Sequence, residues 1–239
     1  MSVPLPGIDV PERVRALAGP GPVEPVWRNV LGGLTFRAGD RYVKWAPRRP
    51  GLDLPREAER LAWAGRFVRV PRVLAHGATG DEQWLVTEAI PAWSAVSEWG
   101  FANPAEAVRA VGAGLRAMHD ALPVAECPWD WGVPARIAAA AERGTVVPPE
   151  LRDPPPIDRL VVCHGDACCP NTLVDERGWA AHVDLGSLGV ADRWADLAPA
   201  VWSAGYNFGP GWGGALLDAY GVDPDPARLD YYDRLWHAT

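Results

Sequence analysis

The most constraining feature of the sequence is a set of polar residues that follow two apolar, strand-like segments near residue 165. His164, Gly165 and Asp166 follow the first segment, and Asn171 comes five residues after this aspartate. Asp184 ends the second segment, eighteen residues after Asp166. Phosphoryl transfer needs one carboxylate to orient the attacking hydroxyl group, and an amide and a second carboxylate to hold Mg²⁺ against a triphosphate. The pattern therefore predicts phosphoryl transfer.

The spacing of Asp166 and Asn171 equals that of the protein-kinase catalytic loop, with Gly165 in place of the arginine before the aspartate. Each residue alone is weak evidence, because Asp and Asn are common in loops. Their order and their places at strand ends make the set specific. We expect Asp166 to be the general base, and Asn171 and Asp184 to bind Mg²⁺, because this ion prefers hard oxygen ligands.

Composition limits the class of protein. A chain of 239 residues, 48% of them hydrophobic, can form one large domain or two small ones. No segment approaches the ~20 apolar residues of a membrane span and the N-terminus shows no signal pattern, so we expect a cytoplasmic protein without a membrane partner. The four cysteines form no C-x-x-C pair, which disfavours a disulfide framework and a structural zinc site.

Charge is distributed unevenly along the chain. Residues 1–90 carry 13 basic and 10 acidic side chains, net +3, whereas residues 91–239 carry 10 basic and 20 acidic ones, net −10. The first part suits an anionic ligand such as a nucleotide, and the second suits a cationic ligand, although solvated surface acidity explains the second part equally well. A nucleic-acid partner is disfavoured, because phosphate backbones require basic surfaces.

The predicted elements separate into two domains. Residues 1–88 read as a nucleotide-binding lobe, a small antiparallel sheet with one helix, from a hairpin over 33–46, a helix over 56–67 and strands over 70–75 and 83–87. Residues 89–239 contain the catalytic loop, the acceptor site and helices expected over 104–122, 134–143, 192–204, 214–220 and 226–236. The expected fold class is α+β, a bilobal protein-kinase-like fold with a small antiparallel-sheet N-lobe and a mainly helical C-lobe.

Lys44 is the only lysine of the chain, beside 22 arginines. An ammonium group is a compact point charge that fits between the α- and β-phosphates of a nucleotide better than a planar guanidinium. Lys44 lies on a predicted strand, and Glu57 starts the next predicted helix and can pair with it, as in kinases. The alternative is a solitary surface lysine and a glutamate favoured by the helix dipole.

Two further segments are compatible with a nucleotide site. Residues 29–33 contain two glycines whose backbone could approach a nucleotide, but they form no G-x-G-x-x-G motif, and a turn without a ligand explains them equally well. Residues 84–91 fit a connector between the lobes, in which the backbone of Glu88 and Ala89 pairs with adenine. We expect ATP or GTP as the nucleotide.

At these residues the chain resembles the aminoglycoside phosphotransferases, especially those that modify a 3′ or 3″ hydroxyl group. The matching segments are 44–47, 57–63, 84–89, 122–128, 162–175 and 183–198. The resemblance implies the kinase-like fold, with Asp166 as the catalytic aspartate and Asn171 and Asp184 as magnesium ligands. It also implies that Lys44 and Glu57 clamp the nucleotide.

The sequence departs from this family in three places. Ser187 stands three residues after the second metal aspartate, where the family usually has an arginine. The region between Cys127 and Leu160, which in the family helps to build the aminoglycoside pocket, is shorter than in familiar members. Residues 235–239 lack the acidic-aromatic tail of the kanamycin-type enzymes. These departures weaken the assignment of the substrate more than the assignment of the phosphoryl-transfer reaction.

We expect a Mg²⁺-dependent resistance kinase that moves the γ-phosphate of the nucleotide to a hydroxyl group of an aminoglycoside. One alternative keeps the fold but acts on another cationic small molecule. A second is a catalytically inactive nucleotide-binding homologue, motivated by Ser187 and the short glycine segment. We expect a monomer or a weak dimer. The candidate carboxylates for binding the cationic acceptor are Glu142, Glu150, Asp153, Asp230 and Asp233.

Overall fold

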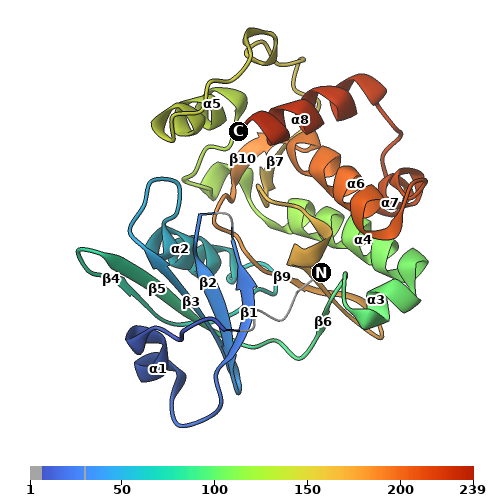
Figure 1. Cartoon of the computed structure of the whole chain (residues 1–239). Helices are drawn as coiled ribbons and strands as arrows, with labels where there is room; N and C mark the ends of the chain where they lie inside the picture. Colours follow the sequence, from blue (N-terminus) through green and yellow to red (C-terminus); the bar gives the residue numbers. More distant parts are fainter. Residues whose placement is uncertain (1–6, 30) are drawn as a thin grey trace. The chain divides into compact units, whose positions relative to one another are not determined.

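The computed structural model describes residues 7–29 and 31–239, which form two compact units (Figure 1). The first unit holds the described residues up to Arg66 together with Val70–Pro91, and the second holds Phe67–Arg69 and Ala92–Thr239. Each unit has its own cluster of buried apolar side chains. No helix in the described part of the chain is both long enough and apolar enough to cross a membrane.

The first unit is built on a five-stranded antiparallel sheet (Figure 1). Its strand order is β1-β2-β3-β5-β4. Helices α1 and α2 pack against this sheet. The elements are α1 (Glu12–Ala18), β1 (Glu24–Arg28), β2 (Leu34–Ala38), β3 (Arg41–Pro47), α2 (Leu54–Ala64), β4 (Val73–Ala78) and β5 (Glu82–Glu88).

Several features of this unit differ from the sequence-based expectation: α1 is a second helix where one was expected, and β4 spans Val73–Ala78 rather than 70–75. Strand β1 was not predicted, because Pro25 interrupts its pattern; proline is tolerated there because β1 is an edge strand with a bulge between Pro25 and Trp27. Helix α2 begins two residues earlier than predicted. The Asp53 side chain caps it by accepting a hydrogen bond from the N–H of Arg56 at 3.0 Å, and a proline occupies its first turn.

The second unit combines helices with two small sheets (Figure 1). Its elements are β6 (Trp93–Ser94), α3 (Glu98–Ala102), α4 (Pro104–Ala121), α5 (Val133–Glu142), β7 (Leu160–Cys163), β8 (Thr172–Asp175), β9 (Gly178–His182), β10 (Gly189–Asp192), α6 (Trp194–Phe208), α7 (Gly213–Tyr220) and α8 (Pro226–Ala238). Strand β7 pairs with β10, and β8 lies between β6 and β9. Helix α4 packs on α7, and α8 packs on α6.

Strand β10 is the main correction in this unit. The sequence predicted a helix from Asp192, but residues Gly189–Asp192 pair with β7, with Val190 opposite Val162. The carboxylate of Asp192 accepts hydrogen bonds from the N–H groups of Trp194, at 3.0 Å, and Asp158, at 2.7 Å. Asp192 therefore ends the strand and lets helix α6 begin at Trp194.

Candidate active site

Asp166 lies in the loop between β7 and a short 3-10 helix, Cys169–Asn171. The Asn171 side chain turns back to this loop. Its Nδ2 atom donates hydrogen bonds to the backbone oxygen of Asp166 at 2.9 Å and to the Asp166 carboxylate at 3.0 Å. The amide nitrogen of Asn171 thus holds the carboxylate in place, while its amide oxygen is an acceptor of the hard type that Mg²⁺ binds.

Asp184 follows β9 in an unusual backbone conformation. Its φ angle is 63°, and it is the one non-glycine residue with positive φ among residues 7–29 and 31–239. This left-handed conformation costs an L-residue about 1–2 kcal/mol, and strained residues concentrate at functional sites. The N–H of Val183 donates to the carbonyl oxygen of Asn171 at 3.0 Å, so the segment that carries Asp184 lies beside Asn171.

The backbone conformation and the close packing at residue 165 explain why glycine, and not arginine, precedes Asp166. Its φ angle is 84°, which favours glycine, and a Cβ atom at this position would overlap the carbonyl group of Ser187. The loop after Asp184 therefore packs directly against the loop of Asp166. A side chain at residue 165 would push the two loops apart.

Asp196 is a further residue at this site, and sequence analysis assigned it no role. It is completely buried in α6, where its carboxylate accepts hydrogen bonds from the backbone N–H groups of His164, at 2.6 Å, and Gly165, at 2.9 Å. Burial raises the pKa of Asp196, but the hydrogen bond from His119 and the N–H groups outweigh burial and hold the pKa below its ordinary value. The signal in the sequence was an aspartate within an apolar helix, since buried carboxylates are rare unless paired.

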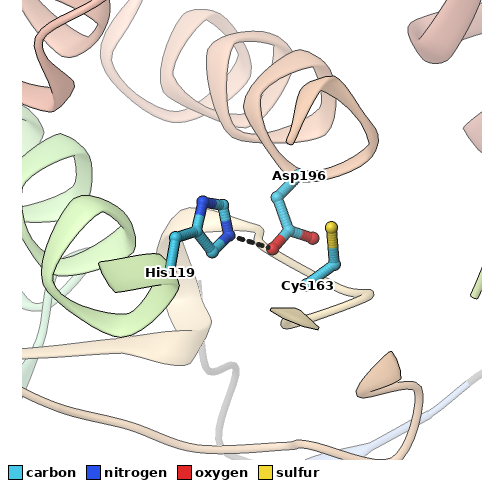
Figure 2. A group of neighbouring side chains, drawn as sticks. All are labelled: His119, Cys163 and Asp196. Carbon is cyan, nitrogen blue, oxygen red and sulfur yellow. Dashed lines mark hydrogen bonds and ion pairs between the residues drawn. The ribbon is translucent and has the colours of Figure 1, made fainter. Parts of the chain in front are cut away.

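His119, a residue of α4, interacts with Asp196 (Figure 2). It also contacts Tyr220 of α7. Its Nε2 atom lies 3.0 Å from the Asp196 carboxylate, and its Nδ1 atom lies 2.9 Å from the hydroxyl group of Tyr220. In the neutral ring, Nε2–H donates to the carboxylate and Nδ1 accepts from the hydroxyl group. Asp196 thereby joins the loop of Asp166 to two helices of the core.

Cys163 completes a group of potential metal ligands with His119 and Asp196, whose ligand atoms lie within 4.8 Å of one another (Figure 2). The Cys163 thiol donates to the carbonyl oxygen of Asp192 at 3.4 Å, and burial raises its pKa well above the ordinary value. Both oxygens of the Asp196 carboxylate already accept hydrogen bonds from N–H groups, and both ring nitrogens of His119 are engaged, by Asp196 and by Tyr220. His119 and Asp196 are thus satisfied by hydrogen bonds within the core.

His182, at the end of β9, is a buried neutral histidine. Its ring makes an edge contact with that of His164, with centroids 5.5 Å apart. Burial and the neighbouring His164 lower the pKa of His182 to about 3, and burial also lowers the pKa of His164. The Nε2 atom of His182 is buried without a hydrogen-bond partner among the described residues.

Lys44 and Glu57 form an ion pair within the first unit. The Lys44 Nζ atom of β3 lies 2.6 Å from the Glu57 Oε1 atom of α2. The Glu57 side chain is 8% exposed and that of Lys44 is 23% exposed, so the pair is largely shielded from water. Strand β3 lies between β2 and β5 in the sheet, and Glu57 occupies the buried face of α2, which together orient both side chains.

The other candidate nucleotide segments are held by contacts within the first unit. The Asn29 side chain accepts hydrogen bonds from the N–H groups of Leu31, at 3.0 Å, and Gly33, at 2.7 Å; Val30 lies outside the described residues. The N–H of Glu88 donates to the Arg72 carbonyl oxygen at 2.9 Å, and that of Ala89 to the Asp40 carbonyl oxygen at 2.8 Å. An adenine contact through Glu88 or Ala89 would therefore use a carbonyl group.

The five acceptor candidates do not form one cluster of free carboxylates. Arg234 lies 3.1 Å from Glu150 and 3.7 Å from Asp230, which offsets part of their charge. The Asp233 carboxylate lies 3.6 Å from Nδ1 of His237, one turn later on α8. The other two candidates are exposed: Glu142 at the end of α5 and Asp153 in the following loop.

Comparison with known proteins gives matches over most of the chain. The sequence pattern of the phosphotransferase enzyme family matches residues 31–232. The aminoglycoside 3′-phosphotransferase of Streptomyces fradiae is 36% identical over 225 residues, which cover 81% of this chain and 84% of that protein. The streptomycin 3″-kinase of Streptomyces griseus is 34% identical over 260 residues, which cover 90% of this chain and 95% of that protein.

Solved structures are similar over the same range. The aminoglycoside phosphotransferase APH(3″)-Id from Streptomyces rimosus superposes with a TM-score of 0.74 at 26% identity, covering 93% of this chain and 94% of that chain. An aminoglycoside-3′-phosphotransferase of type VIII superposes with a TM-score of 0.75 at 31% identity, covering 94% of this chain and 97% of that chain. These likenesses confirm the α+β, kinase-like fold class that the sequence predicted.

Proposed function

The chain belongs to the phosphotransferase enzyme family, and on this premise we propose that it transfers the γ-phosphate of a nucleotide to a hydroxyl group of an aminoglycoside antibiotic. The S. rimosus relative has been solved in complex with ADP and streptomycin, which supports a nucleotide and an aminoglycoside as the two substrates. The observation that carries the proposal is the Asp166 carboxylate, hydrogen-bonded to Asn171 beside the segment of Asp184. Such an enzyme would confer resistance to its antibiotic.

Asp166 is the general base in this proposal. Its carboxylate would accept the proton of the attacking hydroxyl group, and the hydrogen bond from Asn171 keeps the carboxylate in one orientation. Positioning matters more than base strength here, because phosphoryl transfer depends mainly on alignment and on stabilisation of charge. Asp196 contributes to that alignment, because it accepts hydrogen bonds from the N–H groups of His164 and Gly165 and so fixes the backbone just before Asp166.

Asn171 and Asp184 are the residues that would hold Mg²⁺. Their amide and carboxylate oxygens are hard ligands, and the left-handed backbone at Asp184 marks a strained position of the kind found at functional sites. When bound, the ion neutralises charge on the phosphate groups of the nucleotide.

Lys44 is the residue that would bind the nucleotide phosphates in the first unit. Its pairing with Glu57 holds the ammonium group at one place on β3, so that little side-chain entropy is lost when phosphate binds. Ser187 carries no charge where relatives were expected to have arginine. Charge on the phosphates would therefore be offset by Lys44 and the ion.

The test is consumption of ATP and GTP with a panel of aminoglycosides, comparing the wild type with Asp166→Asn. This isosteric change removes the base and should lower kcat by about 10²–10⁴-fold or more, with nucleotide affinity retained. Asp218→Asn, an exposed aspartate of α7, is the matched control and should keep full activity. Nucleotide binding without turnover of any aminoglycoside would contradict the proposal, and so would an active Asp166→Asn variant.

A further inference from the structure

Tyr220, the last residue of α7, has a hydroxyl group to which the proposed chemistry assigns no role. The residue is 1% exposed, and its hydroxyl oxygen lies 2.9 Å from the Nδ1 atom of His119. The two rings meet edge to face, with centroids 5.6 Å apart. A buried hydroxyl group is unfavourable unless it makes a hydrogen bond, so the contact with His119 compensates its burial.

The direction of this hydrogen bond follows from the groups around the hydroxyl group. Burial raises the pKa of Tyr220 to about 12, although the Arg193 guanidinium, with its Cζ atom 6.0 Å from the ring centroid, opposes that rise. The hydroxyl group therefore keeps its proton at neutral pH. A guanidinium has N–H donors and no acceptor, so the proton is donated to Nδ1 of His119.

A donor at Nδ1 decides which nitrogen of His119 carries the ring proton. In a neutral imidazole one nitrogen donates and the other accepts, and the hydrogen bond made by one sets the state of the other. With Nδ1 accepting from Tyr220, the proton sits on Nε2, which lies 3.0 Å from the Asp196 carboxylate (Figure 2). In the other tautomer the lone pair of Nε2 would face a carboxylate oxygen, which is repulsive.

The Asp196 carboxylate depends on this donor because it is completely buried. It accepts hydrogen bonds from the backbone N–H groups of His164 and Gly165, and Nε2–H of His119 is its third donor. A buried carboxylate is destabilised by the loss of each such hydrogen bond. Tyr220 is thus three hydrogen bonds away from the backbone of Gly165, in the loop of the proposed base.

Tyr220 is itself held in place by the packing of α7 on α4. Gly112 of α4 lets the helices approach, since a Cβ atom there would overlap the carbonyl oxygen of Leu216 and lie 3.1 Å from the backbone nitrogen of Tyr220. Arg116 of α4 donates a hydrogen bond to the carbonyl oxygen of Tyr220 at 3.4 Å, and its Cζ atom lies 5.8 Å from the ring centroid. The hydroxyl group is therefore presented to His119 from a fixed position.

We propose that Tyr220 is a positioning residue for phosphoryl transfer: its hydroxyl group fixes the Nε2–H tautomer of His119, and through Asp196 this tautomer keeps the loop of Asp166 in place. The inference rests on the proposed function, since it assigns a residue to that reaction. Tyr220 acts on the loop through two other side chains. Its loss should therefore slow the chemical step, which is sensitive to small displacements of the base, and leave the binding of both substrates unchanged.

The experiment compares Tyr220→Phe, which removes the hydroxyl group and keeps the ring, with Tyr231→Phe as the matched control. The Tyr231 hydroxyl group donates to the carbonyl oxygen of Leu151 at 2.8 Å, a contact of the second unit that involves neither His119 nor Asp196. Tyr220→Phe should lower kcat by about 3- to 30-fold and leave KM for the nucleotide and for the aminoglycoside close to the wild type. Tyr231→Phe should keep the wild-type kcat, although urea unfolding should show a loss of stability in both variants.

Nuclear magnetic resonance of the histidine ring nitrogens at about pH 8, above the ordinary pKa of histidine, identifies the tautomer of His119 directly. The His119 signal is assigned by triple-resonance experiments. We expect Nε2–H in the wild type and a mixture of the two tautomers in Tyr220→Phe. An imidazolium ring or the Nδ1–H tautomer in the wild type would overturn the proposal, and this measurement needs no variant that could fail to fold.

The two measurements separate this proposal from the proposed function. A wild-type kcat in Tyr220→Phe, or an equal fall of kcat in Tyr231→Phe, would overturn the role of Tyr220 and leave the proposed function standing. A wild type that phosphorylates no aminoglycoside would contradict the proposed function. In that case an Nε2–H tautomer that is lost in Tyr220→Phe would still support the link from Tyr220 to His119.

Discussion

Asn171 donates two hydrogen bonds from one amide nitrogen to Asp166, at 2.9 Å to the backbone oxygen and at 3.0 Å to the carboxylate. A single side chain can therefore orient the proposed base with its nitrogen and offer a metal ligand with its oxygen. The two roles are separable by substitution, because aspartate keeps an oxygen ligand but cannot donate.

Asn171→Asp should lower kcat by about 10²-fold or more, because a second carboxylate beside Asp166 replaces a donor with a like charge. Asn171→Ala should lower kcat as well and should also raise the Mg²⁺ concentration needed for half-maximal activity. The measurement is kcat as a function of Mg²⁺ concentration. Full activity of Asn171→Asp would show that the hydrogen bonds to Asp166 are dispensable.

Gly165→Ala should destabilise the protein and reduce kcat, because the new methyl group meets the Ser187 carbonyl group in addition to the cost of positive φ. Gly144 offers a matched control: its φ angle is 78°, with nothing within 4 Å of an added Cβ atom. Gly144→Ala should cost only the ~1–2 kcal/mol of the left-handed conformation, and Gly165→Ala about 1–3 kcal/mol more. Urea unfolding compares the two, and equal losses would contradict the steric argument.

Asp196→Asn should lower both stability and kcat. An amide cannot accept from two N–H groups and from His119 at once, so a buried donor loses its partner. Hydrogen bonds to a buried charge contribute about 1.5–3 kcal/mol, and a loss of that size should appear in the free energy of unfolding. Nucleotide affinity should change less than kcat. A variant with wild-type kcat would exclude Asp196 from positioning the loop.

The free energy of unfolding should decrease as the pH is lowered from about 6.5. With its pKa lowered to about 3, His182 stays neutral in the folded protein, while the unfolded chain binds a proton near its ordinary value. Above pH ~6.5 the neutral histidine therefore makes its full contribution to the free energy of unfolding. By pH 5 this free energy is lower by ~2 kcal/mol for each such histidine. Urea unfolding of the wild type and of His182→Phe at pH 5.0 and 7.5 checks this. Equal pH dependence in the two proteins would refute it.

Lys44→Met should raise the nucleotide KM by about 10–100-fold, as expected for the loss of a charge-assisted hydrogen bond. Lys44→Arg keeps the charge and should have a smaller effect. Aminoglycoside binding, measured without nucleotide, should not change in either variant. A nucleotide KM that is unaffected by Lys44→Met would remove the lysine from the proposed site.

The regular elements were largely predictable, because local periodicity records which face of a helix or strand is buried. The helix over 104–122 was predicted almost to its ends, since its apolar residues recur at helical spacing and a proline opens it. Strand β10 was not predictable in this way. Its four residues are a strand only because they pair with residues of β7 that lie 26 or more positions earlier in the sequence.

The sequence by itself determined the chemical groups of the site and the pairs that lie close along the chain. Asp166 and Asn171 share one loop and Lys44 and Glu57 are thirteen residues apart, so short connections bring them within reach. Only the tertiary structure decided that Asp196 accepts hydrogen bonds from Gly165 and His164, which lie 31 and 32 positions earlier in the sequence. The same holds for the contact between His119 and Asp196, which are 77 positions apart. The physical reason is that contacts at such separations arise from the packing of whole helices and strands, which no local spacing encodes.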